Sequence, residues 1–393
     1  MKVLFIIQGE GRGHLTQALS LAQILRSAGH ELAGALVGVA DDRPVQAFFA
    51  SQIQAPVWAF VSPSLQYNPK TNALDLLATT RQVIRHLPNY WRSLRFIDDA
   101  IRQHRPDVVV NFYDVLGGLT YAHLRPQVPM VCVAHQYLLL HPHFPHPKGH
   151  RLDRFLVNFN TWLTSLGAQR RLALSFVPMP DQPEQQLTVV PPLLRQEVVG
   201  RNPADMGTGE PGYLLAYVSQ DGLGRKLLDA HRAHPELPIR CFKGGLNEAV
   251  EQVDDTFTFH RIDGQAFLDQ MESCRAVVTT AGFESICEAM YLGKPVLMMP
   301  MPNHYEQLCN AHDAEQAGAG VISERLFDLQ KLLDYLPRHR PETSPTFRQW
   351  QQQCARFFLK HLELAAQSVE APPSPVIRPV YGTTFLRRLT ALR

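Results

Sequence analysis

Residues 279–320 read TTAGFESICEAMYLGKPVLMMPMPNHYEQLCNAHDAEQAGAG. This segment follows a short apolar run at 276–280, turns at Gly282 and continues with apolar side chains at helical spacing over 285–292. A second apolar run comes at 295–299. Strand, glycine turn, helix and strand in this order are typical of a parallel sheet whose strands are joined by helices. The segment therefore predicts an α/β domain.

The same alternation runs through the rest of the chain. Further apolar runs, separated by helical patterns, lie at 3–7, 31–39, 107–111, 128–134, 213–218 and 239–242. Between the two groups, residues 201–212 contain almost no apolar side chains, as is typical of a linker. We therefore predict fold class α/β, with two Rossmann-like domains that face each other across a cleft.

The length of 393 residues also favours more than one domain. We predict an N-terminal domain over 1–190 and a linker over 191–212. A C-terminal domain is predicted over 213–345. The helical pattern at 346–369 is predicted to cross back to the first domain, and 370–393 form a proline-rich basic tail.

Composition excludes several classes of protein. A net charge of +2 without a basic run argues against a nucleic-acid partner. The first apolar run is too short for a signal peptide, and no stretch reaches the roughly 18 apolar residues of a membrane span. The six cysteines include no CxxC pair. We expect a cytoplasmic protein. Contact with the inner face of a membrane stays an alternative, because 81–102 and 154–171 are basic and amphipathic.

A glycine-rich loop, QGEGRGH at 8–14, lies between the first predicted strand and the first predicted helix. Glycines let the backbone approach a ligand closely, and a helix N-terminus offers free N–H groups. The spacing differs from the dinucleotide fingerprint GxGxxG, so an NAD(P) oxidoreductase is the weakest alternative. His14 is a candidate general base, or alternatively only caps the turn. The other loop residues of interest are Gly9, Gly11, Arg12 and Gly13.

The turn at 279–285 carries a second group of candidates. Thr280 and Ser285 supply hydroxyls, and Gly282 permits a turn into a helix whose first amides are unpaired. A turn of this kind can hold a diphosphate. Glu288 has an alternative role, because Ser285 and Glu288 also match the capping-box pattern of a helix start.

This combination of segments resembles one family. The run at 279–320 resembles the donor-binding signature of the UDP-glycosyltransferase superfamily, in which G-x-x-S-x-x-E-A is followed by G-K-P, E/D-Q and N-A. It is most similar to prokaryotic members related to the peptidoglycan-precursor N-acetylglucosaminyltransferase. The opening GEGRGHLTQALSLAQILRSAGHEL resembles the start of the family's acceptor domain.

The resemblance implies a GT-B fold and a hexosyltransferase. Such an enzyme moves a sugar from a nucleotide-sugar, most often a UDP-sugar, to a hydroxyl of a small-molecule or lipid-linked acceptor. It implies no metal and no cofactor, since the nucleotide-sugar is a co-substrate. We expect inversion, because a base that activates the acceptor for direct attack needs no enzyme nucleophile.

The resemblance also implies site residues. The donor-binding positions are Ile262, Thr280, Ala281, Gly282, Ser285, Glu288, Glu306 and Gln307. The turn would hold the diphosphate, Glu288 the ribose, and Glu306 with Gln307 the sugar. Ile262 would contact the base through its backbone.

On the acceptor side, the resemblance implies that His14 deprotonates the hydroxyl. Asp114 matches approximately the carboxylate that steadies this histidine in many members. One departure concerns Thr280, because several relatives carry a His or Arg there that neutralises the diphosphate. Without a His or Arg at this position, the charge of the diphosphate would be neutralised by amides, a hydroxyl and Arg12 from across the cleft.

Two rival functions stay open. A nucleotide-sugar 2-epimerase has the same architecture, and a nucleotide-sugar-binding protein without catalysis would keep the donor site alone. Five histidines at 135–150 raise a metal site as a further possibility. They are interleaved with prolines in a predicted loop, so we expect acceptor recognition there and no metal.

Overall fold

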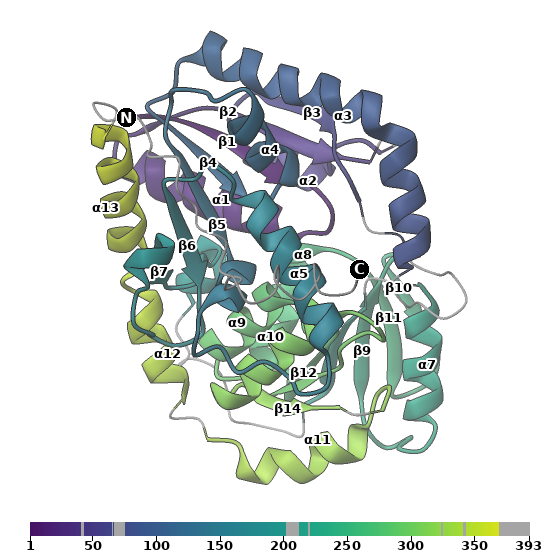
Figure 1. The fold of residues 1–393 in the computed structure, drawn as a ribbon. Coiled ribbons are helices and arrows are strands. Elements are labelled where there is room, and N and C mark those ends of the chain that lie inside the picture. Colours follow the sequence, from purple (N-terminus) through teal and green to yellow (C-terminus); the bar gives the residue numbers. More distant parts are fainter. Residues whose placement is uncertain are drawn as a thin grey trace, which may run out of the picture.

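The computed structural model describes residues 1–40, 43–64, 66, 75–201, 212–218, 221–323, 325–340 and 343–368. Two seven-stranded sheets form the centres of two α/β halves. In Figure 1 the N-terminal half lies above the second half. The predicted fold class, two Rossmann-like domains, is confirmed. None of the helices in these ranges combines the length and the apolar composition that a bilayer span requires.

The first sheet has the order β3-β2-β1-β4-β5-β6-β7, and all of its strands are parallel. The strands are β1 (Lys2–Gln8), β2 (Glu31–Val39), β3 (Val57–Val61), β4 (Val108–Phe112), β5 (Met130–Ala134), β6 (Arg170–Leu174) and β7 (Leu187–Val190). Helices cover both faces, so β4 and β5 are buried along their whole length.

The helices of the first half are α1 (Gly13–Ser27), α2 (Ala47–Gln52), α3 (Leu76–His104), α4 (Val115–His123) and α5 (Arg151–Thr164). The 3₁₀ turns η1 (His135–Leu140) and η2 (Pro183–Gln185) and the short helix α6 (Gln196–Val199) complete it. The glycine loop is fixed at its first glycine. The Gly9 amide donates to the Gly38 carbonyl at 2.8 Å, and a Cβ on Gly9 would lie 2.5 Å from that oxygen.

The second sheet has the order β10-β11-β9-β8-β12-β13-β14, with only β10 antiparallel. The strands are β8 (Leu214–Val218), β9 (Ile239–Lys243), β10 (Val250–Gln252), β11 (Phe257–Arg261), β12 (Ala276–Thr279), β13 (Val296–Met298) and β14 (Gly320–Ile322). The helices are α7 (Asp221–His231), α8 (Gly264–Ser273), α9 (Phe283–Tyr291), α10 (Tyr305–Gln316) and α11 (Leu329–Tyr335), with the 3₁₀ turn η4 (Leu336–Arg338).

The chain then forms two helices, α12 (Thr343–Gln351) and α13 (Cys354–Gln367), where one continuous pattern was expected. Helix α12 contacts both halves: Ser344 donates to the Tyr291 carbonyl at 3.2 Å, and the Trp350 indole donates to the Ser175 carbonyl at 3.0 Å. Helix α13 then packs on α1 and on strands of the first sheet (Figure 1).

Segments next to both passages of the chain between the halves bond to one residue. Tyr291, at the end of α9, donates from its hydroxyl at 3.0 Å to the carbonyl of Val199, the last residue of α6, which precedes the first passage. Its own carbonyl accepts from Ser344 and from Arg348 of α12, which form the second passage.

Candidate active site

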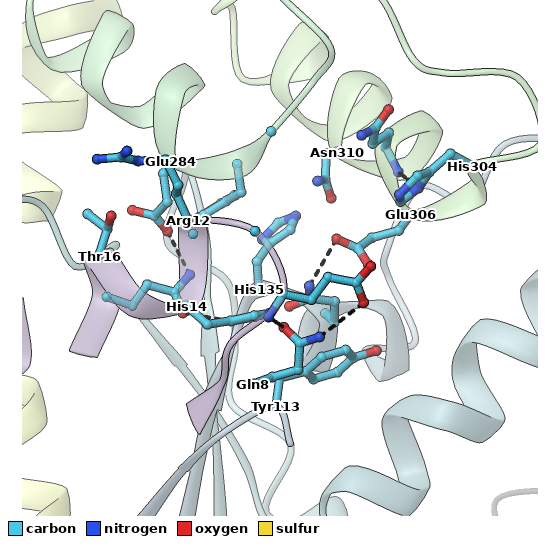
Figure 2. Close-up of a pocket in the computed structure, with 18 of the residues that line it drawn as sticks. Gln8, Arg12, His14, Thr16, Tyr113, His135, Glu284, His304, Glu306 and Asn310 are labelled. Atoms are coloured by element: carbon cyan, nitrogen blue, oxygen red, sulfur yellow. Dashed lines mark hydrogen bonds between the residues drawn. The ribbon is translucent and has the colours of Figure 1, made fainter. Parts of the chain in front are cut away.

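A cavity of about 840 Å³ lies between the two halves, at the ends of strands from both sheets. The predicted residues that line it are Gly11, Arg12, Gly13, His14, Ile262, Gly282, Ser285, Glu288, Glu306 and Gln307. Figure 2 shows side chains of α1 and Tyr113, which directly follows β4, together with side chains of α9 and α10. The structure therefore brings the two predicted loops to one place.

Four predicted residues do not line the cavity: Gly9, Asp114, Thr280 and Ala281. Gly9 packs against β2, as described above. Thr280 and Ala281 are buried behind the turn. Ala281 has a φ of 59°, which few non-glycine residues adopt, and its carbonyl accepts from the Asn310 amide at 3.1 Å. Thr280 and Ala281 thus shape the turn from behind.

His14 lies in the first turn of α1 and does not cap that helix, because the N-cap residue is Arg12 and no side chain makes the capping bond. The imidazole stacks on the Tyr113 ring at 5.5 Å between centroids. Burial lowers the pKa of His14 below its ordinary value, and the Glu306 carboxylate opposes this shift. The ring is therefore neutral at pH 7, as a general base requires.

The hydrogen bonds of Gln17 decide which ring nitrogen carries the proton. The Gln17 amide nitrogen donates to Glu284 at 2.6 Å, so its oxygen is turned towards His14, 3.3 Å from Nδ1. That oxygen can only accept, which places the proton on Nδ1 and leaves the lone pair on Nε2.

Asp114 does not support His14, contrary to the prediction. It is the N-cap of α4, and one carboxylate oxygen accepts from the Leu116 and Gly117 amides at 2.8 and 3.2 Å. The other oxygen accepts from the Ser62 hydroxyl at 2.8 Å. Burial raises the pKa of Asp114 to about 6, although these bonds oppose the shift. The partner of the histidine is Gln17.

Glu288 is buried on α9 and forms an ion pair with Arg195, whose Nε lies 2.7 Å from the carboxylate. The capping-box alternative for Glu288 is wrong, because the N-cap of α9 is Gly282 and Ser285 lies inside the helix. The Ser285 hydroxyl instead donates to the Gly282 carbonyl at 3.0 Å.

Two guanidinium groups meet at Gly264, the first residue of α8. A Cβ there would lie 3.2 Å from Arg12 and 3.3 Å from Arg195. Arg12 comes from the glycine loop and stacks on the Phe48 ring at 3.9 Å. Both arginines line the cavity, and Glu288 forms its ion pair with Arg195 and not with Arg12. This end of the cavity therefore suits an anion.

The predicted sugar-binding pair occupies the other end. The Glu306 carboxylate accepts from Gln136 of η1 at 2.9 Å, across the two halves. The Gln307 side-chain oxygen accepts from the Met301 amide at 2.9 Å and holds the loop before α10. Figure 2 shows Glu306 reaching towards His14 and Tyr113.

Three of the histidines at 135–150 bond backbone carbonyls of the first half, and His135 also lines the cavity and stacks on Phe283 of the second half at 4.0 Å between ring centroids. His135 bonds the Leu174 carbonyl at 2.8 Å, His141 the Pro180 carbonyl at 2.9 Å and His146 the Leu139 carbonyl at 3.0 Å. Within the described ranges, no three His, Cys, Asp or Glu side chains lie together as metal ligands do.

Comparison with known proteins adds the family. The family model described as "Glycosyl transferase family 1" matches residues 1–339, which include both sheets. The chain belongs to this family. An uncharacterised glycosyltransferase of Methanosarcina acetivorans is 25% identical over 346 residues, which cover 81% of this chain and 83% of that protein.

Solved structures of glycosyltransferases have the same fold. One is Phytolacca americana UGT2, complexed with UDP-2-fluoroglucose and pterostilbene, with a TM-score of 0.61, 14% identity and coverage of 94% of this chain and 100% of that one. Another is Acinetobacter baumannii MurG, with a TM-score of 0.55, 15% identity and coverage of 92% and 99%. The predicted family and the predicted enzyme class, a glycosyltransferase, are confirmed.

Sequence reasoning missed several residues of this glycosyltransferase's cavity. These are Gln17, Gln136, Arg195, Glu284 and Asn310. Gln17 lies one helical turn after His14, so the spacing could have revealed it. Asn310 belongs to the N-A motif of the quoted run. Gln136 and Arg195 carry no local signal, because their partners lie 170 and 93 residues away.

Proposed function

We propose that this glycosyltransferase moves a sugar from a UDP-sugar to a hydroxyl acceptor, with inversion and without a metal ion. The observation that carries the proposal is His14, a neutral histidine with a free Nε2 in the cavity between the halves. It lines the same cavity as the turn at Gly282 and the arginine pair, so the base and the anion site share one space.

The second half supports the donor part of this proposal. The N-terminus of α9, with Gly282 as its N-cap, offers unpaired amides to a diphosphate. Arg12 and Arg195 supply the positive charge that a metal ion or the missing side chain at Thr280 would otherwise provide. Glu288 is left for the ribose, and Ile262 for the base. The plant relative described above was solved with a UDP-sugar analogue.

The proposed reaction is a single displacement. His14 Nε2 removes the proton of the acceptor hydroxyl as its oxygen attacks the anomeric carbon. The bond from that carbon to the diphosphate oxygen breaks at the same time, and its electron pair leaves with the nucleoside diphosphate. One displacement inverts the anomeric configuration, and the arginine pair stabilises the charge on the leaving group.

Thermal unfolding with nucleotides tests the donor. UDP at about 100 times its Kd should stabilise the fold by about 2.7 kcal/mol, and dTDP and GDP at the same concentration by less. A larger effect of dTDP or GDP would contradict the UDP assignment. Incubation with a UDP-sugar alone should give no epimer by NMR, whereas an epimer would favour the 2-epimerase.

A further inference from the structure

Helix α5 turns an apolar stripe towards solvent. Leu152, Phe155, Leu156 and Phe159 recur at the i, i+3, i+4, i+7 spacing that normally faces a core. All four are exposed, and Leu152 retains 69% of its accessible surface. The opposite face of α5 is buried through Thr161 and Thr164 instead. An outward stripe of this kind marks a binding surface.

Helix α3 presents a second apolar group. The helix contains Pro88, and its outer surface on both sides of this proline carries exposed large side chains. They are Leu77, Ile84, Leu87, Trp91 and Phe96. Of the 14 exposed large apolar residues in the described ranges, nine lie on α3 and α5. We call the exposed apolar residues of these two helices the α3–α5 face.

The charges around this face have one sign. Arginines 81, 85, 92 and 95 are exposed on α3, and the sequence from 76 to 97 contains no Asp or Glu. Lys148, Arg151 and Arg154 are exposed at the start of α5. The acid in that stretch, Asp153, pairs with His150 and lines the cavity.

The cavity extends to the same two helices. Thr79 and Val83 of α3 and Val157 of α5 line it, one or a few residues from the exposed positions. In Figure 1, α3 runs along the outer edge of the first half, and α5 lies in front of the sheet. An acceptor that enters between the helices therefore passes the α3–α5 face.

We propose that the α3–α5 face binds the surface of an anionic lipid bilayer and that the acceptor is a lipid whose head group carries the reacting hydroxyl. The acceptor part rests on the proposed function. Apolar side chains that enter the head-group region, with arginines around them, are what interfacial helices use to bind anionic lipid.

Trp91 provides a direct probe of this contact. It is the exposed one among the four tryptophans, since Trp350 is buried and Trp58 and Trp162 are half-buried. The full chain is mixed with vesicles of phosphatidylcholine, with and without about one third phosphatidylglycerol. Brominated lipid should quench the fluorescence of the wild type on anionic vesicles, and Trp91→Phe should remove most of the quenching.

Two variants and two matched controls test the binding by vesicle sedimentation. Leu152→Ser/Phe159→Ser and Arg81→Glu/Arg85→Glu should each lower partition into anionic vesicles by roughly tenfold or more. The controls are Leu364→Ser on α13 and Arg232→Glu in the second half, both exposed, and they should bind like the wild type. Thermal unfolding with UDP should be the same for all of them.

The outcomes separate the two proposals. Equal partition of the variants and the wild type, or no binding to anionic vesicles, overturns the bilayer proposal. A dimer that Leu152→Ser/Phe159→Ser converts to a monomer, without vesicle binding, shows instead that the face joins two copies. Vesicle binding with no UDP stabilisation would sink the proposed function alone. When the enzyme is incubated with a membrane-lipid extract and a UDP-sugar that is labelled in its sugar, the label should appear in the organic phase. Transfer of the label to a water-soluble acceptor, with none in the organic phase, overturns the proposal of a lipid acceptor.

Discussion

At His14, one neighbouring amide determines the position of the proton. Because Gln17 donates to Glu284, it accepts from Nδ1 and leaves Nε2 as the base. We expect His14→Ala to lower kcat by roughly 10²–10⁴-fold, the contribution typical of general-base catalysis. Donor affinity, measured by isothermal titration with UDP, should change little. Full turnover in His14→Ala would show that the loop is only a structural turn.

The pH profile of the wild type follows from the same residue. His14 acts in its neutral form, and burial lowers its pKa below the ordinary 6.5. Activity should therefore persist through pH 6.5 and fall only at more acidic values, as the imidazole takes up a proton. If kcat already declines before the pH has been lowered to 7, this assignment is contradicted.

Arg195 should act on phosphate and Glu288 on the nucleoside. Arg195→Ala should weaken UDP binding by about 1.5–3 kcal/mol, the range for a hydrogen bond to a charged group, and uridine binding by less. Arg201→Ala is the matched control, because Arg201 pairs with Glu272 at 2.7 Å and does not line the cavity. Equal losses for uridine and UDP in a titration would place Arg195 away from the diphosphate.

At the scale of the element, Asp114 is the N-cap of α4, and we expect it to take no part in the reaction. Asp114→Asn keeps two acceptor bonds to the helix start, so turnover should stay within about threefold of the wild type. Burial raises the folded pKa from 3.8 to about 6, so the folded state takes up a proton in this range. The contribution of Asp114 to the free energy of unfolding is therefore fully present below pH 3.8 and is lost as the pH rises through 6.

Urea unfolding at several pH values checks this sign. Relative to Asp114→Asn, the wild type should lose free energy of unfolding between about pH 4 and 6 and then level off. A loss of turnover of 100-fold without any change in stability would restore Asp114 as the partner of His14.

Elements that repeat a local pattern could be predicted, and partners distant in the chain could not. Eight of the fourteen strands in the described ranges and α9 were predicted, because apolar runs and a glycine turn fix them locally. The strands without a predicted counterpart are β3, β6, β7, β10, β11 and β14. The division of the predicted crossing helix into α12 and α13 could not be predicted, since the break at 352–353 follows no proline or glycine. Asp114 was misassigned because its sequence position cannot tell a helix cap from a partner of His14.

At the scale of the whole molecule, Glu284 connects the two halves through Gln17. Burial raises the pKa of Glu284 from 4.5 to about 8, and the Glu288 carboxylate adds to this shift. The folded state is therefore most stable below pH 4.5 and loses this contribution as the pH rises through 8. Glu284 also lines the cavity, so its deprotonation places a negative charge near the proposed diphosphate site. UDP affinity should fall between about pH 7 and 9 in the wild type, while Glu284→Gln should remove this dependence. An identical decline in both proteins, followed by titration calorimetry, would assign it to another group.

Tyr291 connects one end of α9 to both halves. Its hydroxyl bonds to Val199 of α6, and its carbonyl accepts from Ser344 of α12. Helix α9 extends from Tyr291 to Gly282 at the cavity, a length of about 13 Å for its nine residues. One end of this helix is held by the segments that join the halves, and the other end lines the cavity. The bonds that hold the halves together therefore also fix the position of the helix start beside the proposed donor.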